Sequence, residues 1–385
     1  MEAGGTPAVP GEIAAVAEAG GTPVVPASIA AAIEAGGRPV VSGEVTDRLE
    51  AGGTPAVSGG AVGCEQPLSP SRLLPGWVSA LIYAGLFLVT FLFAEVLFTA
   101  PLALLTAQAL RLTPSGLSER ELFDPAVLGL ERWIPLVALS FCGKLWVVLT
   151  LTAWLGRRLE NRSLGELGLT RGIAWLGELP LGLLLAALLF LWQVGAGSML
   201  GWYHVQWMAP KYHPAGLVGV SFLLLLPAAA VEEVCCRGFL YTALERSWGR
   251  WGAVIGSALA FASLHSFNPD FAQHPLAFAG LLLAGIYLGM ARLVRGSLWL
   301  PIVLHTGWNL LEGPVFGLPV SGLRPPASLL EVTVSGPDFW TGGSFGPEAG
   351  LLLCVNLIPH CGLLWLLRRP PGTGAGSAET PERGA

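Results

Sequence analysis

Two adjacent glutamates and an arginine lie inside an otherwise apolar segment between Pro227 and Tyr241. Ionisable groups inside a membrane are costly, so they mark candidate functional sites. Glu233 and Arg237 are four residues apart, a spacing that lets them pair along one helix face. Glu232 points about 100° away from Glu233 around such a helix. The predicted pair therefore leaves Glu232 as the carboxylate available for chemistry.

Two further polar clusters follow, each with members four residues apart, so that they share a helix face. They are Phe261 with His265 and His305 with Asn309. Taken singly, each has a structural explanation, because membrane histidines and asparagines often hydrogen-bond between helices and Phe261 is expected to serve in packing. A free carboxylate, two imidazoles and an amide on three helices together indicate a catalytic site.

The spacing along the chain places the first two clusters at one depth. A turn is predicted at 248–249, and Glu232 precedes it by about as many residues as His265 follows it. Both lie on the order of 25 Å from the turn, so an antiparallel hairpin brings them together. His305 follows Arg295 by ten residues, roughly 15 Å at the same rise, so its depth is expected to match less well.

This set of residues suits hydrolysis. Glu232, held away from bulk water, can take a proton from water as a general base, and His265 can orient that water or share the proton. His305 and Asn309 form a pair of donors for a developing oxyanion. Arg237, through its ion pair, is expected to fix the helix and tune the electrostatics.

Zinc is the alternative, because two histidines and a glutamate are a recognised catalytic ligand set with one open position. In that case the ligands would be Glu232, His265 and His305. The sequence has no His-Glu-x-x-His motif, which excludes a zincin-like helix. It also has neither the Gly-x-Ser-Gly nor the Gly-x-Gly-Asp motif of other membrane proteases.

The composition is that of an integral membrane protein. Hydrophobic residues make up 53% of the 385 residues and charged residues only 12%, with a mean hydropathy of +0.62, whereas soluble domains carry about 25% charge. No basic run indicates nucleic acid as a partner, and the six cysteines show no metal-binding spacing. The expected partners are the lipid bilayer and a peptide or protein substrate at the membrane.

The predicted fold is an all-α, polytopic transmembrane helical bundle, since a helix needs about 20 apolar residues to cross a bilayer. About eight apolar runs qualify, the seventh of them short. They are residues 77–98, 133–155, 173–196, 215–246, 250–267, 275–293, 297–312 and 349–367. Arginines concentrate in alternate connecting segments, and with eight spans the positive-inside rule places those segments and both termini in the cytoplasm.

The first 63 residues are a tandem repeat in which Glu-Ala-Gly-Gly recurs with a constant 16-residue period. High Gly and Pro content favours a flexible, disordered or weakly structured extension, although four such units could stack as a small solenoid. After this extension, residues 1–63, the predicted parts are N-terminal membrane helices at 77–200, a catalytic core at 215–312, an extramembrane loop at 313–348, a last membrane helix at 349–367 and a disordered tail at 368–385.

The three ordered motifs resemble the CPBP family, the type II CAAX prenyl endopeptidases and bacteriocin-processing relatives also called the Abi family. The family pattern is Glu-Glu-x-x-x-Arg, then Phe-x-x-x-His, then His-x-x-x-Asn. The chain matches it over roughly 215–312, about a quarter of its length, at Glu232, Glu233, Arg237, Phe261, His265, His305 and Asn309.

The resemblance implies an eight-helix intramembrane endopeptidase. By this resemblance Glu232 and His265 activate water, while His305 and Asn309 stabilise the oxyanion. Members have been described both as zinc-dependent and as metal-independent; we favour no cofactor, because Asn309 is a poor zinc ligand and a good oxyanion donor. Implied substrates are prenylated CAAX tails, or leader and membrane-associated peptides in bacteria. A bacterial cytoplasmic membrane is the favoured location.

Two other functions compete with proteolysis. A non-catalytic scaffold or immunity protein of the same fold predicts that Glu232→Gln preserves function. A proton-coupled transporter using Glu232 and the histidines as a relay predicts inverted repeats of broken helices. Comparison of 77–200 with 215–367 shows no duplication of the charged motif, so the protease is favoured.

Overall fold

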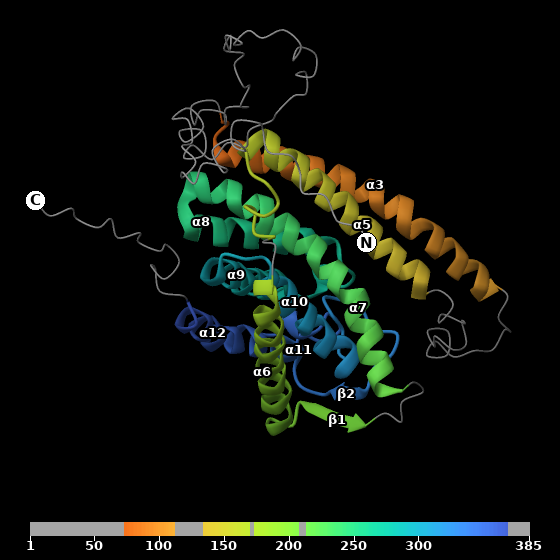
Figure 1. Cartoon of the computed structure of the whole chain (residues 1–385). Helices are drawn as coiled ribbons and strands as arrows, with labels where there is room; N and C mark the ends of the chain where they lie inside the picture. Colours follow the sequence, from red (N-terminus) through yellow and green to blue (C-terminus); the bar gives the residue numbers. More distant parts are fainter. Residues whose placement is uncertain (1–72, 112–133, 170–172, 208–212, 369–385) are drawn as a thin grey trace, which may run out of the picture. The chain divides into compact units, whose positions relative to one another are not determined.

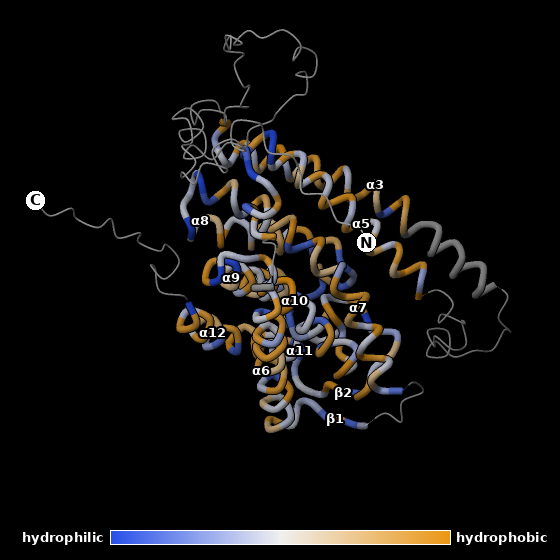
Figure 2. The backbone as a smooth tube through the Cα atoms, in the orientation of Figure 1, coloured by the Kyte–Doolittle hydropathy of each residue, from blue (hydrophilic) through white to orange (hydrophobic). Residues whose placement is uncertain are grey.

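The computed structural model describes residues 73–111, 134–169, 173–207 and 213–368. The predicted repeat at 1–63 and nearly all of the predicted tail lie outside these residues. The described chain is mostly helical, and Figure 2 shows that most of its helices, α3, α5 and α6 among them, are largely apolar.

Eight main helices carry the fold of the described residues, and Figure 1 shows how they are arranged. They are α3 (Gly76–Arg111), α5 (Ile134–Leu155), α6 (Glu178–Met199), α7 (Pro214–Glu233), α8 (Tyr241–Leu264), α9 (Ala277–Arg295), α10 (Trp299–Leu310) and α12 (Leu351–Leu366). Shorter helical segments are η3 (Gly156–Glu160), η4 (Ile173–Gly177), η5 (Val234–Leu240), η6 (His265–Phe267), η7 (Phe271–Gln273), η8 (Leu311–Val315), α11 (Asp338–Thr341) and η9 (Pro347–Ala349).

Five helical stretches of the described chain are long and apolar enough to cross a membrane, which supports an integral membrane protein. They are Gly76–Phe98, Ile134–Glu160, Trp175–Met199, Pro214–Phe267 and Ala277–Arg295. The predicted count of eight spans is not confirmed. One of the five stretches has 54 residues and covers two of the predicted spans, while α10 and α12 have only 12 and 16 residues.

A sharp turn at Gly249 divides that long stretch into two legs. Gly249 has φ 70° and ψ 179° inside α8, a backbone conformation that is essentially restricted to glycine. The predicted turn at 248–249 is thus confirmed. It forms the hairpin that sets Glu232 on one leg opposite His265 on the other.

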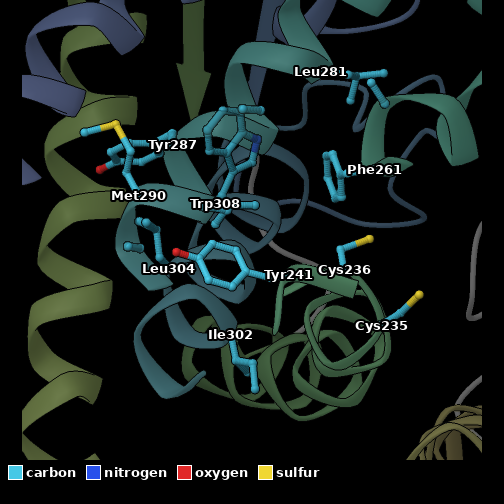
Figure 3. Packing of buried hydrophobic residues seen from close by; sticks show 14 of the residues in the cluster. Cys235, Cys236, Tyr241, Phe261, Leu281, Tyr287, Met290, Ile302, Leu304 and Trp308 are labelled. Atoms are coloured by element: carbon cyan, nitrogen blue, oxygen red, sulfur yellow. The ribbon is translucent and has the colours of Figure 1, made fainter. Parts of the chain in front are cut away.

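α10 is the central helix of the half that carries the motifs. It contacts α6, α7 and α9, and nearly all of its residues are buried. Figure 3 shows Leu304 and Trp308 of this helix among the buried side chains, together with Phe261 and Tyr287. Because protein surrounds α10, its shortness does not expose backbone polar groups to lipid.

A two-stranded sheet departs from the predicted all-α class. β1 (Tyr203–Trp207) pairs antiparallel with β2 (Leu330–Val334), with Tyr203 opposite Val334. β2 reads Leu-Glu-Val-Thr-Val, and such β-branched residues favour a strand. The predicted loop at 313–348 therefore contains regular structure.

α3 is longer than expected. It continues to Arg111, whereas the apolar run predicts an end at residue 98. The added residues are rich in Ala and Leu, which have the highest helix propensities, so the helix continues although the hydropathy falls.

Candidate active site

A π-helical turn carries the glutamate–arginine motif. α7 ends at Glu233, and η5 (Val234–Leu240) continues it with every residue buried. π-turns inside α-helices are rare and often lie at functional sites. This turn presents Glu232 and Glu233 to different neighbours.

Glu233 is fully buried and binds two side chains through one oxygen. Its Oε1 atom lies 3.0 Å from Nη1 of Arg237 and 2.9 Å from Nδ1 of His305. The predicted ion pair with Arg237 is present. The contact with His305 was not predicted; because the carboxylate accepts from Nδ1–H, it fixes the imidazole and leaves Nε2 for other partners.

Arg237 is held on three sides. Besides Glu233, its Nη2 donates to the carbonyl of Gly285 at 2.9 Å. Its guanidinium carbon lies 4.5 Å from the centre of the Phe261 ring, a distance at which a cation is attracted to the ring face. Phe261 is therefore more than the packing residue expected from the sequence.

Phe261 also contacts both histidines of the motifs. Its ring centre lies 4.4 Å from that of His265 and 5.7 Å from that of His305. The backbone carbonyl of Phe261 accepts a hydrogen bond from Nδ1–H of His265 at 2.8 Å. This bond places the remaining ring nitrogen, Nε2, towards Glu232.

Glu232 and His265 face each other across the hairpin, as their spacing predicts. Oε2 of Glu232 lies 3.6 Å from Nε2 of His265, and the side chains are 35% and 13% exposed. This distance is too long for a direct hydrogen bond. Oε2 is buried and has no hydrogen-bond partner among the described residues, so it could accept a hydrogen bond from a water or a ligand.

The sequence predicts that His305 lies at a different depth from Glu232 and His265, and this prediction is wrong. Depth counted from Arg295 assumes that the turn before α10 lies at the membrane surface. The loop at 161–169 covers that turn instead: the amide of Leu298 donates to the carbonyl of Gly168 at 2.9 Å. The start of α10 is therefore inside the protein, and His305 reaches Glu233.

Asn309 lies one turn after His305 on α10 and is partly buried. No hydrogen bond joins its side-chain amide to another residue that the structure describes. The amide is free to donate to a ligand on the face that it shares with His305. Its contribution to an oxyanion site stays a prediction.

The residues of the alternative zinc set make two separate contacts in the described chain. Within the described ranges, no three His, Cys, Asp or Glu side chains are placed to hold a metal ion. One contact joins Glu232 to His265. The other joins Nδ1 of His305 to Glu233. Zinc held by Glu232, His265 and His305 stays the alternative to a metal-independent mechanism.

Gly285 is a residue of the candidate site that the sequence motifs did not indicate. A side chain at this position would approach Cα of Ala258 to 2.9 Å, and one at Gly289 would lie 3.2 Å from Val254. These glycines let α9 approach α8 closely enough for the Gly285 carbonyl to meet Arg237. The Gly-x-x-x-Gly spacing is a signal for such helix packing.

Comparisons with known proteins agree with the motifs. Residues 214–311 match the family model of the type II CAAX prenyl endopeptidases described as Rce1-like. No curated protein and no solved structure matches the chain. The matched segment begins at α7 and runs through α10, so it contains all three motifs. Over this core, residues 214–311, the chain is similar to the Rce1-like type II CAAX prenyl endopeptidases, the family that its motifs resemble.

Proposed function

We propose that the protein is an intramembrane endopeptidase that hydrolyses a peptide bond near the membrane surface by a metal-independent glutamate mechanism. Its substrates are CAAX-type prenylated peptides or other membrane-associated peptides. The observation that carries the proposal is the contact of Glu232 with His265, 3.6 Å apart and partly exposed. The match of residues 214–311 to a protease family supports peptide hydrolysis.

In the proposed first step, Glu232 takes a proton from a water held between it and His265. The resulting hydroxide attacks the peptide carbonyl carbon and forms a tetrahedral oxyanion. Glu232, now protonated, then donates to the leaving nitrogen as the carbon–nitrogen bond breaks. A general base within hydrogen-bond reach of water contributes about 10²–10⁴-fold to the rate.

His305 and Asn309 are proposed to hold the oxyanion. Glu233 accepts from Nδ1–H of His305, and its negative charge supports a proton on Nε2 as well. Nε2–H and the Asn309 amide would then donate to the oxyanion. Removing one such donor from a hydrolase costs about 10²–10³-fold in turnover.

The test is cleavage of a fluorogenic farnesylated CAAX-type peptide by the purified full-length protein in detergent. The same peptide without the farnesyl group is the matched control, and each assay is repeated with a strong zinc chelator. Faster cleavage of the farnesylated peptide and no effect of the chelator are expected. Loss of cleavage with the chelator would replace the metal-independent mechanism with the zinc alternative.

A non-catalytic scaffold of the same fold is the second candidate. It predicts that neither peptide is cut, and that Glu232→Gln preserves whatever cellular function a deletion strain lacks. Complementation by this variant would contradict the protease proposal. We also propose a bacterial cytoplasmic membrane as the location, and the arginine distribution supports placing both chain termini in the cytoplasm.

A further inference from the structure

A groove lies along α5, away from the motif residues. Its volume is about 590 Å³, and its walls include Thr150, Trp154 and Leu164. A second groove of about 290 Å³ shares Thr150 and Trp154 and continues along α5 past Trp146. Volumes of this order accommodate small-molecule ligands.

Between Trp146 and Trp154 the groove is mainly apolar. This part runs along a candidate membrane span, Ile134–Glu160. Two tryptophans on its rim, Trp146 and Trp154, are 69% and 54% exposed. Large exposed aromatic side chains on a membrane helix are expected to contact lipid chains or the interface. An occupant of the groove must therefore have an apolar portion.

The end of the groove is cationic. Arg157 and Arg158 line it, both exposed, and neither has an ion-pair partner among the residues that the structure describes. Arginines bind phosphate groups well, because their planar forks donate two parallel hydrogen bonds. An occupant that carries a phosphate at one end of an apolar chain would complement both parts.

The nearby acids do not neutralise these arginines. Glu160 accepts two hydrogen bonds from Arg246, at 3.0 Å and 2.8 Å. Glu166 accepts from the amide and the hydroxyl of Ser163, at 2.8 Å and 2.7 Å. Both carboxylates thus have other hydrogen-bond partners, and neither forms an ion pair with Arg157 or Arg158.

We propose that this groove binds one anionic phospholipid, with its phosphate at Arg157 and Arg158 and an acyl chain along Thr150 and Trp154. The attraction of arginine for anionic headgroups supplies the selectivity, and the apolar walls supply the chain contact. The site is independent of peptide hydrolysis.

The lipid would also brace a loop that supports the motif helices. Leu164, in the groove wall, belongs to the 161–169 loop. The carbonyl of Leu167 in this loop accepts from Arg292 at 3.4 Å, and Arg292 donates to the carbonyl of Arg237 at 3.3 Å. Bound lipid is therefore expected to raise the thermal stability of the full-length protein.

Native mass spectrometry of the purified protein measures the binding. Dioleoyl phosphatidylglycerol is titrated against dioleoyl phosphatidylcholine, and one tightly held phosphatidylglycerol per chain is expected. The Arg157→Gln/Arg158→Gln double variant should bind it about thirtyfold more weakly, because each arginine near an anionic surface contributes about a factor of five. Thr150→Trp, which fills the groove and keeps both arginines, should also lose the lipid.

Arg250→Gln is the matched control, because Arg250 is exposed and lies outside the groove. This variant should bind phosphatidylglycerol with the affinity of the wild type. Equal binding of the two lipids, an unaffected double variant, or an equal loss in Arg250→Gln would each overturn the proposal. Thermal unfolding of every variant without added lipid confirms that the losses do not come from misfolding.

Discussion

The Nδ1 atom of His305 lies 2.9 Å from Oε1 of Glu233, the oxygen that also binds Arg237. The two adjacent glutamates therefore serve different histidines. Glu232 faces His265 in a partly exposed contact, while Glu233 holds His305 in a fully buried one. Their separation of about 100° around the helix divides the motif into a partly exposed half and a buried half.

Replacing Glu233 is expected to damage both stability and activity. Glu233→Gln leaves the buried guanidinium of Arg237 without its counter-charge and should lower the free energy of unfolding by about 3–5 kcal/mol. Denaturant unfolding in detergent measures the change. The Glu233→Gln/Arg237→Met double variant should recover part of it, because an apolar side chain needs no counter-charge. Unaltered stability of the single variant would contradict the buried ion pair.

The ring of Phe261 should matter beyond its volume. Phe261→Leu removes the contact with Arg237 and both imidazoles, so we expect a loss of about 1–2 kcal/mol in stability and slower peptide cleavage. Phe239→Leu is the control, since Phe239 is buried and stacks on Tyr83 at 4.2 Å, away from the histidines. Equal effects of the two variants on cleavage would show that Phe261 serves only in packing.

The turn at Gly249 should depend on glycine. Its φ of 70° with ψ of 179° strains any other residue, so Gly249→Ala is expected to cost about 1–3 kcal/mol. Gly195→Ala lies in α6, where an added Cβ meets nothing within 4 Å, and should be neutral or slightly stabilising. Thermal unfolding of both variants compares them, and matched behaviour would argue against a strained turn.

Acid should weaken the loop at 161–169 through Glu166. Hydrogen bonds from the amide and hydroxyl of Ser163 lower the pKa of Glu166 below its usual 4.5. A lowered folded-state pKa adds stability above the unfolded-state pKa, and this stability is lost as pH falls through the folded value. The thermal midpoint of Glu166→Gln should therefore fall less than that of the wild type below about pH 4.5. Since Glu166 is exposed, the difference is small, and parallel pH profiles would refute it.

Residue spacing predicted those contacts of the candidate site that depend on helix geometry alone. The Glu233–Arg237 pair and the approach of Glu232 to His265 both follow from a regular rise and turn. The position of His305 could not be predicted from residue spacing. It depends on the loop at 161–169, which covers the turn before α10 through Gly168. No periodicity in α10 itself encodes that contact.

The sheet escaped prediction for a similar reason. β1 and β2 have only five residues each and lie far apart in the chain. An alternation of apolar and polar residues over only five positions is too short to distinguish a strand from a loop. Their pairing depends on α6 and the chain after α10 placing them side by side, which is a property of the assembled bundle.

Peptide cleavage by Glu232→Gln tests the central claim most directly, because the amide keeps the shape of the side chain and removes its basicity. Glu232→Gln is expected to lose at least about 10²-fold in turnover and to keep the thermal midpoint of the wild type. Glu245→Gln, on α8 and outside the site, is the matched control and should cleave at the wild-type rate. Wild-type turnover in Glu232→Gln would contradict the assignment of Glu232 as the general base.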